Sequence, residues 1–166
     1  MFIKHSGQRV GILIDVANLY HSAKNIYGAR VNFKEILKTA TSNRSLIRVF
    51  AYVISTKTGE EKPFFDALTK LGIETRVKEL QEFYGGQKKA DWDVGLVIDA
   101  IRIAPSVDAL VIVSGDGDFI SLVEYLKNQG TRVEIAAFGR SASSKLREIS
   151  DEFIDLGEEP KYLLKK

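Results

Sequence analysis

The chain has 166 residues, about the size of one ordinary domain, and its 45% hydrophobic and 28% charged residues are typical of a globular protein. It contains no cysteine, which excludes disulfides, zinc–thiolate sites, iron–sulfur clusters and cysteine nucleophiles. Lys and Arg number 24 against 22 for Asp and Glu, so overall charge gives no argument for a nucleic-acid partner. With no apolar run near the roughly 20 residues of a membrane span and no signal-peptide pattern, we expect a cytoplasmic protein without membrane contact.

In the first half of the chain, strands are predicted to alternate with helices. The elements in chain order are a strand over 10–14, helices over 18–27 and 33–40, a strand over 46–54, a helix over 60–71 and a strand over 74–83. The continuous apolar run of the first strand is typical of a strand buried in a parallel sheet. Asn32 is a suitable N-cap for the second helix, and Gly28 and Gly72 are suitable stops for the first and third.

The second half continues the alternation after a stretch rich in glycine and lysine, 85–89, which predicts an exposed, mobile loop. Its elements are a helix over 91–103, a strand over 109–113, a helix over 119–128, a strand over 132–138, a helix over 143–149 and a strand over 153–156. The helix over 91–103 has the strongest pattern. The side chains expected on its buried face are Val94, Val97, Ile98 and Ile101.

This alternation predicts an α/β fold in three layers, Rossmann-like, with a mostly parallel central sheet flanked by helices. We treat residues 1–166 as a single domain, with its core at about 8–157 and a tail at 158–166. Residues from Gly157 onward are expected to fray or to pack on a partner. Ligands of such sheets bind outside the carboxyl ends of the strands, so the residues that follow each strand indicate the chemistry.

Acidic residues occupy these positions. They follow the first and fourth strands and begin the helix after the third, as Asp15, Asp93, Asp116 and Asp118. Asp93 lies on one stripe with the apolar residues four and eight positions later, so we expect it to point toward the sheet edge. Four carboxylates in one crevice would repel one another, and a divalent cation with oxygen ligands, Mg²⁺ or Mn²⁺, is the usual resolution. Such a site activates water or stabilises a departing oxyanion at phosphate.

Some of these acids have structural alternatives. Asp91 and Asp118 each precede a helix that they could cap, and Asp116 lies in a glycine-rich bend where it could form an Asx turn. Asp15 is harder to explain structurally, because an unpaired carboxylate at the end of a buried strand is costly.

Asp99 lies six residues after Asp93, about 9 Å further along the helix and on another side, so we expect it to pair with Arg102 and to stay out of the site. Asn18 could bond an acid or a phosphate, or cap its helix, and Ser114 is a further candidate substrate contact. His21 has no second histidine near it in the sequence, so a histidine metal site is not expected.

Basic and aromatic residues flank the proposed site. Lys88 and Lys89 are either a solvated pair or phosphate contacts, since lysine neutralises backbone charge regardless of sequence. Tyr84 and Trp92 could stack on bases, although Trp92 could equally belong to the core.

Taken together, these motifs resemble the NYN domain of the PIN-like nuclease superfamily, in its LabA-like branch. The matching stretches are Ile14–Asn18, Lys89–Val94 with Asp99, Val113–Phe119 and Ser144–Phe153. The resemblance covers about residues 8–157. It implies a PIN-like, Rossmann-like sheet and a divalent-metal-dependent ribonuclease site. In that site the acidic positions are matched by Asp15, Asp93, Asp116 and Asp118, and a further one by Asp99.

The leading hypothesis is therefore a Mg²⁺- or Mn²⁺-dependent ribonuclease acting on RNA, as a monomer or a homodimer. The alternative is a non-catalytic RNA- or protein-binding regulator with the same fold. A phosphatase of the haloacid dehalogenase type is disfavoured because Val16 and Ala17 follow Asp15, where that class has a second Asp. A dinucleotide oxidoreductase is disfavoured because no Gly-x-Gly-x-x-Gly follows the first strand.

Overall fold

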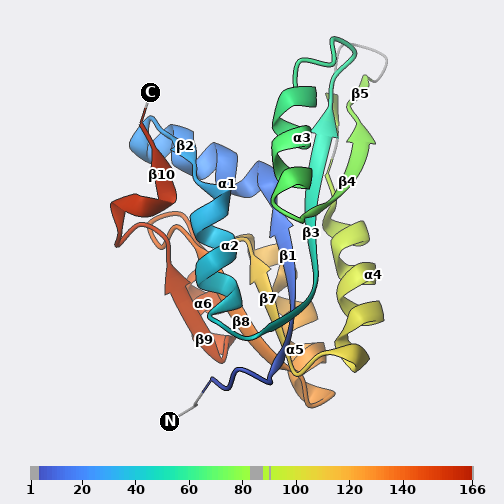
Figure 1. Ribbon diagram of the computed structural model, residues 1–166, viewed down its shortest axis with the longest axis vertical. Coiled ribbons are helices and arrows are strands. Elements are labelled where there is room, and N and C mark those ends of the chain that lie inside the picture. The colour runs from blue at the N-terminus through green and yellow to red at the C-terminus, as the bar shows by residue number, and fades with distance from the viewer. Residues whose placement is uncertain (1–3, 83–87, 90, 166) are drawn as a thin grey trace.

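The computed structural model of the chain describes residues 4–82, 88–89 and 91–165 (Figure 1). Its strands are β1 (Arg9–Asp15), β2 (Arg30–Val31), β3 (Ser45–Ser55), β4 (Glu74–Glu79), β5 (Gln81–Glu82), β6 (Lys88–Lys89), β7 (Ala109–Val113), β8 (Arg132–Ala137), β9 (Glu152–Asp155) and β10 (Leu163–Leu164). Its α-helices are α1 (Val16–Ser22), α2 (Phe33–Thr41), α3 (Lys62–Lys70), α4 (Asp93–Ile103), α5 (Ile120–Asn128) and α6 (Ser144–Ile149). A π-helical segment (Ala23–Tyr27) extends α1, and 3₁₀ turns are formed by Ala104–Ser106, Gly117–Phe119 and Pro160–Tyr162.

Within these residues, six strands form one parallel sheet in the order β4-β3-β1-β7-β8-β9. The chain starts in the middle at β1 and moves outward through β3 to β4. It then returns to the other side of β1 as β7 and moves outward again to β9. This confirms the expected α/β fold with a mostly parallel sheet. The reversal between β1 and β7 marks the place where such sheets bind ligands.

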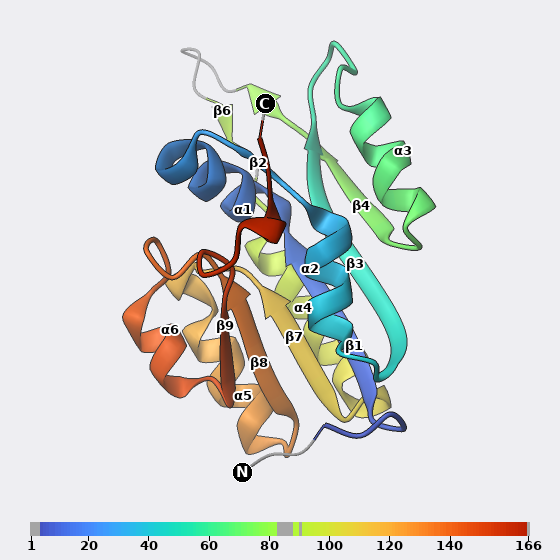
Figure 2. The same cartoon turned by 60° about the vertical axis from the view of Figure 1, so that its left-hand side comes forward.

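Helices cover both faces of the sheet (Figures 1 and 2). Ile12 and Ile14 of β1 belong to one core, which α1, α2 and α3 complete. Leu13 points the other way, into a second core with α4, α5 and α6. Strands buried on both faces are continuously apolar, which is why the runs at 10–14 and 109–113 were clear signals. Among the described residues, no helix is long and apolar enough to span a bilayer.

The orientation expected for α4 is wrong for Val94, Ile98 and Ile101, whereas Val97 is partly buried against the second core as expected. Its buried apolar side chains are Leu96, Ala100 and Ile103. Its solvent side carries Val94, Ile98 and Ile101, with 71%, 44% and 42% of each residue exposed. The helix is apolar around most of its circumference, so its periodicity does not select one face. The actual face brings small Ala100 against the sheet, where larger side chains would hold the helix further away.

The expectations for the tail and for one loop are also wrong. β10 pairs antiparallel with β2, and buried Tyr162 shares a 2.8 Å hydrogen bond between its hydroxyl and Thr39 Oγ1. Lys88 and Lys89 form the short strand β6, antiparallel to β5, rather than a loop. The rest of that predicted loop, 85–87, lies outside the described residues. Two-residue strands have no periodicity, so the sequence offered no signal for them.

At the amino ends of the strands, a buried ion pair links the α2–β3 connection to β8. Arg44 Nη1 lies 2.7 Å from Glu134 Oε2 and Nη2 lies 2.8 Å from Oε1. Both side chains are almost fully buried. Burial by itself raises the pKa of Glu134, but the hydrogen bonds and charge of Arg44, with Lys4 and Arg132, outweigh it and hold that pKa below its usual range. Arg44 Nη2 also donates to the carbonyl oxygen of Ala40 at 2.8 Å, closing the end of α2.

Arg44→Met should therefore destabilise the protein by about 3–5 kcal/mol, because it leaves the Glu134 carboxylate buried without its main partner. Urea unfolding measures this loss. The matched control is Arg9→Met, which removes an arginine from the exposed pair with Asp108 and should cost far less. Equal losses in the two variants would contradict a structural role for the buried pair.

Candidate functional site

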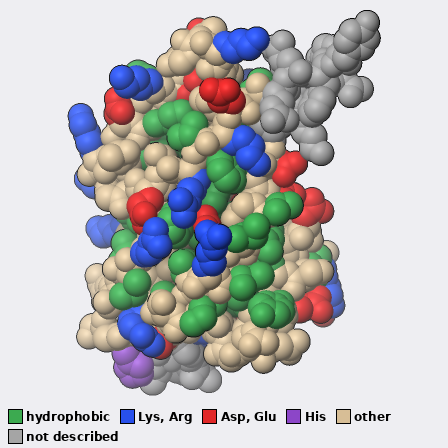
Figure 3. All heavy atoms as spheres, turned by 90° about the vertical axis from the view of Figure 1, so that its right-hand side faces the viewer, with side chains coloured by type: hydrophobic (Ala, Val, Ile, Leu, Met, Phe, Trp, Pro, Cys, Tyr) green, Lys and Arg blue, Asp and Glu red, His purple; other side chains and the backbone are tan. Residues whose placement is uncertain are grey.

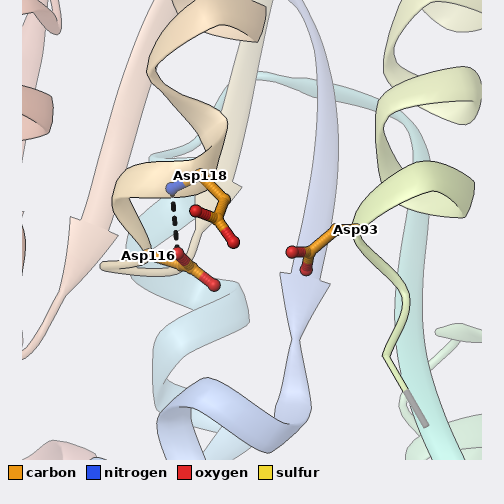
Figure 4. Close-up of side chains that lie close together, drawn as sticks. All are labelled: Asp93, Asp116 and Asp118. Atoms are coloured by element: carbon orange, nitrogen blue, oxygen red, sulfur yellow. Dashed lines mark hydrogen bonds between the residues drawn. The ribbon is translucent and has the colours of Figure 1, made fainter.

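Three aspartates meet at the carboxyl edge of the sheet (Figure 4). Asp93 is the first residue of α4, and Asp116 and Asp118 lie in the loop that follows β7. Among the described residues, one carboxylate oxygen from each of the three lies within 4.8 Å of the other two. An all-oxygen, triply acidic set fits a hard divalent cation such as Mg²⁺ or Mn²⁺, which prefers carboxylate ligands.

Local backbone structure aims two of these acids. Asp116 Oδ1 accepts a hydrogen bond from the Asp118 N–H at 2.9 Å, so Asp116 caps the 3₁₀ turn that precedes α5. The structural alternative foreseen for Asp116, an Asx-type turn, is thus present together with the cluster. The cap considered as an alternative role for Asp118 does not form: the N-cap position of α5 is Phe119, without a side-chain hydrogen bond, and Asp116 caps only the preceding 3₁₀ turn. Both carboxylates extend toward Asp93, and that of Asp118 is exposed.

Asp15 lies beside this cluster rather than within it. Its Oδ2 accepts a hydrogen bond from Ser114 Oγ at 2.8 Å, and its Oδ1 accepts one from the Asn18 N–H at 3.2 Å. Together with Asp93 and Asp116 it lines a crevice of about 220 Å³. The four acids predicted from the sequence therefore share one edge of the sheet, with three of them clustered and Asp15 lining the crevice beside them.

The two polar residues predicted as substrate contacts are engaged within the protein. Ser114 is fully buried, and its Oγ also accepts a hydrogen bond from the Asp116 N–H at 3.2 Å. The side-chain oxygen of Asn18 accepts one from the Gly115 N–H at 3.0 Å. Ser114 and Asn18 thus fasten the loop after β7 onto the end of β1, which sets the position of Asp116.

The crevice is also lined by two aromatic residues, Tyr52 and Trp92, and by aliphatic Ile54. We refer to Tyr52 and Trp92 as the aromatic wall. Trp92 Nε1 donates to the Val53 carbonyl at 2.9 Å, and Lys78 Nζ lies 4.6 Å from the indole ring centroid. These contacts fix the Trp92 ring as part of the wall. Sequence reasoning missed Tyr52 and Lys78, because inside a strand neither residue type signals a site.

Asp99 lies outside the cluster, as expected, but its partners differ from the expectation. It is buried and accepts a hydrogen bond from the Tyr52 hydroxyl at 2.8 Å. Its ion pair is with Arg76 of β4, at 3.2 Å, and not with Arg102. Since α4 turns Asp99 toward the sheet and leaves Arg102 exposed, the pairing three residues apart does not form.

Asp91 lies just before α4 and accepts a hydrogen bond from the first residue of that helix. The residue at the N-cap position is Trp92, and Asp91 Oδ1 accepts a hydrogen bond from the Asp93 N–H at 3.2 Å. Lys78 Nζ donates to the Asp91 carbonyl at 2.8 Å, which ties this segment to β4. Tyr84 and the side chains of Lys88 and Lys89 lie outside the described part of the chain.

Comparison with known proteins identifies the family. Residues 9–157 match the family model of the NYN domain. The chain belongs to the NYN domain family. The low amplitude and bright protein LabA of Synechococcus elongatus is 27% identical over 158 residues, which span 90% of this chain and 84% of that protein. The crystal structure of a protein of unknown function from Vibrio parahaemolyticus is 30% identical, with a TM-score of 0.88, and covers 98% of this chain and all of that one.

The electrostatics of this NYN domain reflect its crowded acids. Burial, followed by the negative charge of Asp116 and its other neighbours, raises the pKa of Asp93 to about 6. Burial also raises the pKa of Asp15, although the hydrogen bonds from Ser114 and Asn18 oppose it. Ionised carboxylates clustered this closely repel one another, and a bound cation is favoured because its positive charge offsets that repulsion.

Without metal, the stability of this NYN domain should depend on the protonation of Asp93. An acid whose pKa rises on folding, here from 3.8 to about 6, weakens the folded state as pH increases between those values. Asp93→Asn should therefore gain stability relative to wild type from about pH 4 to pH 6 and level off above. Urea unfolding in EDTA across this range measures the difference in free energy of unfolding between the variant and wild type. Glu134 also has a shifted pKa, but it is present in both proteins, so its contribution cancels from the difference.

The matched control for this measurement is Asp66→Asn, which removes an exposed acid on α3 away from the crevice. Its difference from wild type should stay flat with pH. A stability difference that is also independent of pH for Asp93→Asn would show that folding does not raise the pKa of Asp93.

Proposed function

We propose that this NYN domain is a divalent-metal-dependent ribonuclease that hydrolyses RNA phosphodiester bonds. The observation that supports this most strongly is the cluster of Asp93, Asp116 and Asp118, with oxygens within 4.8 Å of one another at the carboxyl edge of a parallel sheet. Membership of a family in the PIN-like nuclease superfamily supports it further.

In this proposal Asp93, Asp116 and Asp118 hold Mg²⁺ or Mn²⁺. When bound, the ion supplies a lowered pKa for the attacking water and positive charge for the phosphate and the departing oxygen. Asp15, oriented by Ser114 and the Asn18 N–H, lines the same crevice, and we propose that it orients the attacking water and accepts its proton.

The RNA itself needs contacts beyond the acids. The aromatic wall gives a sugar or base an apolar surface, and Lys78 places an ammonium group over the Trp92 ring. We propose Lys88 and Lys89 as further phosphate contacts, because β5 and β6 directly precede the segment that leads into α4.

Cleavage of a mixed RNA pool in Mn²⁺ tests this proposal. Asp93→Asn and Asp116→Asn should each reduce the rate more than about a hundredfold, since they remove ligand charge. Ser114→Ala should cost about tenfold to a hundredfold, because it removes only the hydrogen bonds that orient Asp15 and the loop. Wild type in EDTA should be inactive, and Asp66→Asn should cleave normally.

The two Asn variants must first give wild-type circular dichroism and melting behaviour, so that lost cleavage reports on the site. Folded Asn variants that cleave at the wild-type rate would refute the assignment of these acids.

The exposed stripe of α4 favours a second candidate function, a regulator that acts through protein contacts. Figure 3 shows hydrophobic side chains gathered on the face that carries α4 and β4, beside several Lys and Arg side chains. Val94, Ile98 and Ile101, the exposed large apolar side chains of α4, supply the apolar part of this face. Large exposed apolar patches are typical of protein interfaces, and a symmetric homodimer is the commonest such assembly.

If this face forms a homodimer, Ile98→Asp should convert it to a monomer, because the new carboxylate would be buried without a partner. Sedimentation velocity measures the change. Tyr125→Asp on α5, which alters an exposed apolar side chain elsewhere, should leave the dimer intact. A wild-type monomer at micromolar concentration would remove the homodimer from the proposal.

A further inference from the structure

A second, larger cavity lies in the layer formed by α1, α2 and α3. Its volume is about 600 Å³, within the ~300–1,000 Å³ typical of small-molecule sites. It shares no lining residue with the acidic crevice. Figure 2 shows the elements that border it, with β2 and the C-terminal strand on one side and α3 on the other.

The walls of this cavity are apolar. Phe33 of α2 and Phe64 of α3 pack together with ring centroids 5.5 Å apart, and Val16, Leu68 and Leu71 are among the other apolar residues of the lining. Water in contact with such walls has few hydrogen-bond partners, so an apolar ligand that displaces it gains free energy.

Two cations border the apolar walls. Arg30 of β2 and Lys34 of α2 both line the cavity and are exposed. Elsewhere in the molecule arginines are paired, as Arg9 is with Asp108 and Arg48 with Glu74. Neither Arg30 nor Lys34 has a carboxylate partner among the described residues. Two unpaired cations beside one apolar cavity complement a ligand with an anionic head and an apolar body.

Only two of the described lining residues carry an uncharged polar side-chain group, Tyr20 and Asn32. Asn32, the N-cap of α2, uses its side-chain oxygen to accept a hydrogen bond from the Glu35 N–H. A base buried here would leave most of its donors and acceptors unpaired, which is costly. An aliphatic chain has no such groups and matches the walls.

We propose that this cavity binds a free small-molecule amphiphilic anion, a single carboxylate or sulfate on an aliphatic chain. The chain lies among Phe33, Phe64 and Leu68, and the anionic head lies with Arg30 and Lys34. This proposal does not rest on the proposed ribonuclease activity.

Isothermal titration with decanoate, decyl sulfate and decyltrimethylammonium tests both parts of the ligand. Decanoate and decyl sulfate should bind with one-to-one stoichiometry, and the cationic amphiphile should bind at least about tenfold more weakly. Arg30→Gln combined with Lys34→Gln should weaken decanoate binding by about tenfold or more. Lys38→Gln combined with Lys70→Gln removes the same charge from exposed positions outside the cavity and should leave binding unchanged.

Ala67→Trp fills the cavity from α3 and should abolish binding of both anions. If that variant does not fold, the comparison of the Arg30→Gln, Lys34→Gln double variant with wild type still tests the proposal, because both substitutions are at exposed positions. Equal binding of the cationic and anionic amphiphiles, equal decanoate affinity in the two double variants, or the absence of saturable binding would each overturn the proposal.

Discussion

The parallel pairing of β1 with β7 is the constraint on which the rest of the site depends. The paired residues run in register from Val10 with Ala109 to Ile14 with Val113. The next residue on each strand is Asp15 and Ser114, so the register itself brings the serine hydroxyl to the carboxylate. Because the connections leave β1 and β7 in opposite directions, a gap opens above these two ends. The loop carrying Asp116 and the start of α4 border that gap.

A buried carboxylate is neutralised by an arginine at the amino ends of the strands, whereas carboxylates cluster together at the carboxyl ends. At the amino ends, Arg44 neutralises Glu134 with two short hydrogen bonds inside the protein. At the carboxyl ends, Asp93 and Asp116 face each other, and burial together with the negative charge of Asp116 raises the pKa of Asp93. A fold stabilised firmly at one end tolerates such strain at the other. Charge strain of this kind is typical of sites that bind a cation or carry out catalysis.

Much of this arrangement was predictable from the sequence. Apolar runs buried on both faces identify parallel strands, and the ends of parallel strands share an edge, so Asp15 and Asp116 were expected at the same edge of the sheet. That they are neighbours there depends on the pairing of β1 with β7, which the sequence does not reveal. The face of α4 was not predictable, because its apolar residues surround most of the helix. Nor was the pairing of Asp99 with Arg76, which depends on that face and on a strand distant in sequence.

Other features depend on contacts that a local pattern does not encode. The strand β10 exists because the tail meets β2, and Trp92 belongs to the crevice wall because its indole N–H meets the Val53 carbonyl. Ser114 and Asn18 could be identified as residues of the site but not as links within it. Their hydrogen bonds join residues far apart in the chain, and only the β1–β7 register brings them together.

The short helix α1 is a shared wall. Val16 and Tyr20 face the apolar cavity, whereas Asn18 and His21 face the acidic crevice. A ligand on one side that shifts this helix also moves the cap at Asp15 on the other. Thermodynamic linkage makes any such effect symmetric: the factor by which an occupant of the cavity changes cation affinity is the factor by which the cation changes affinity for that occupant. Seven residues of helix thus give two chemically unrelated sites a common mechanical element.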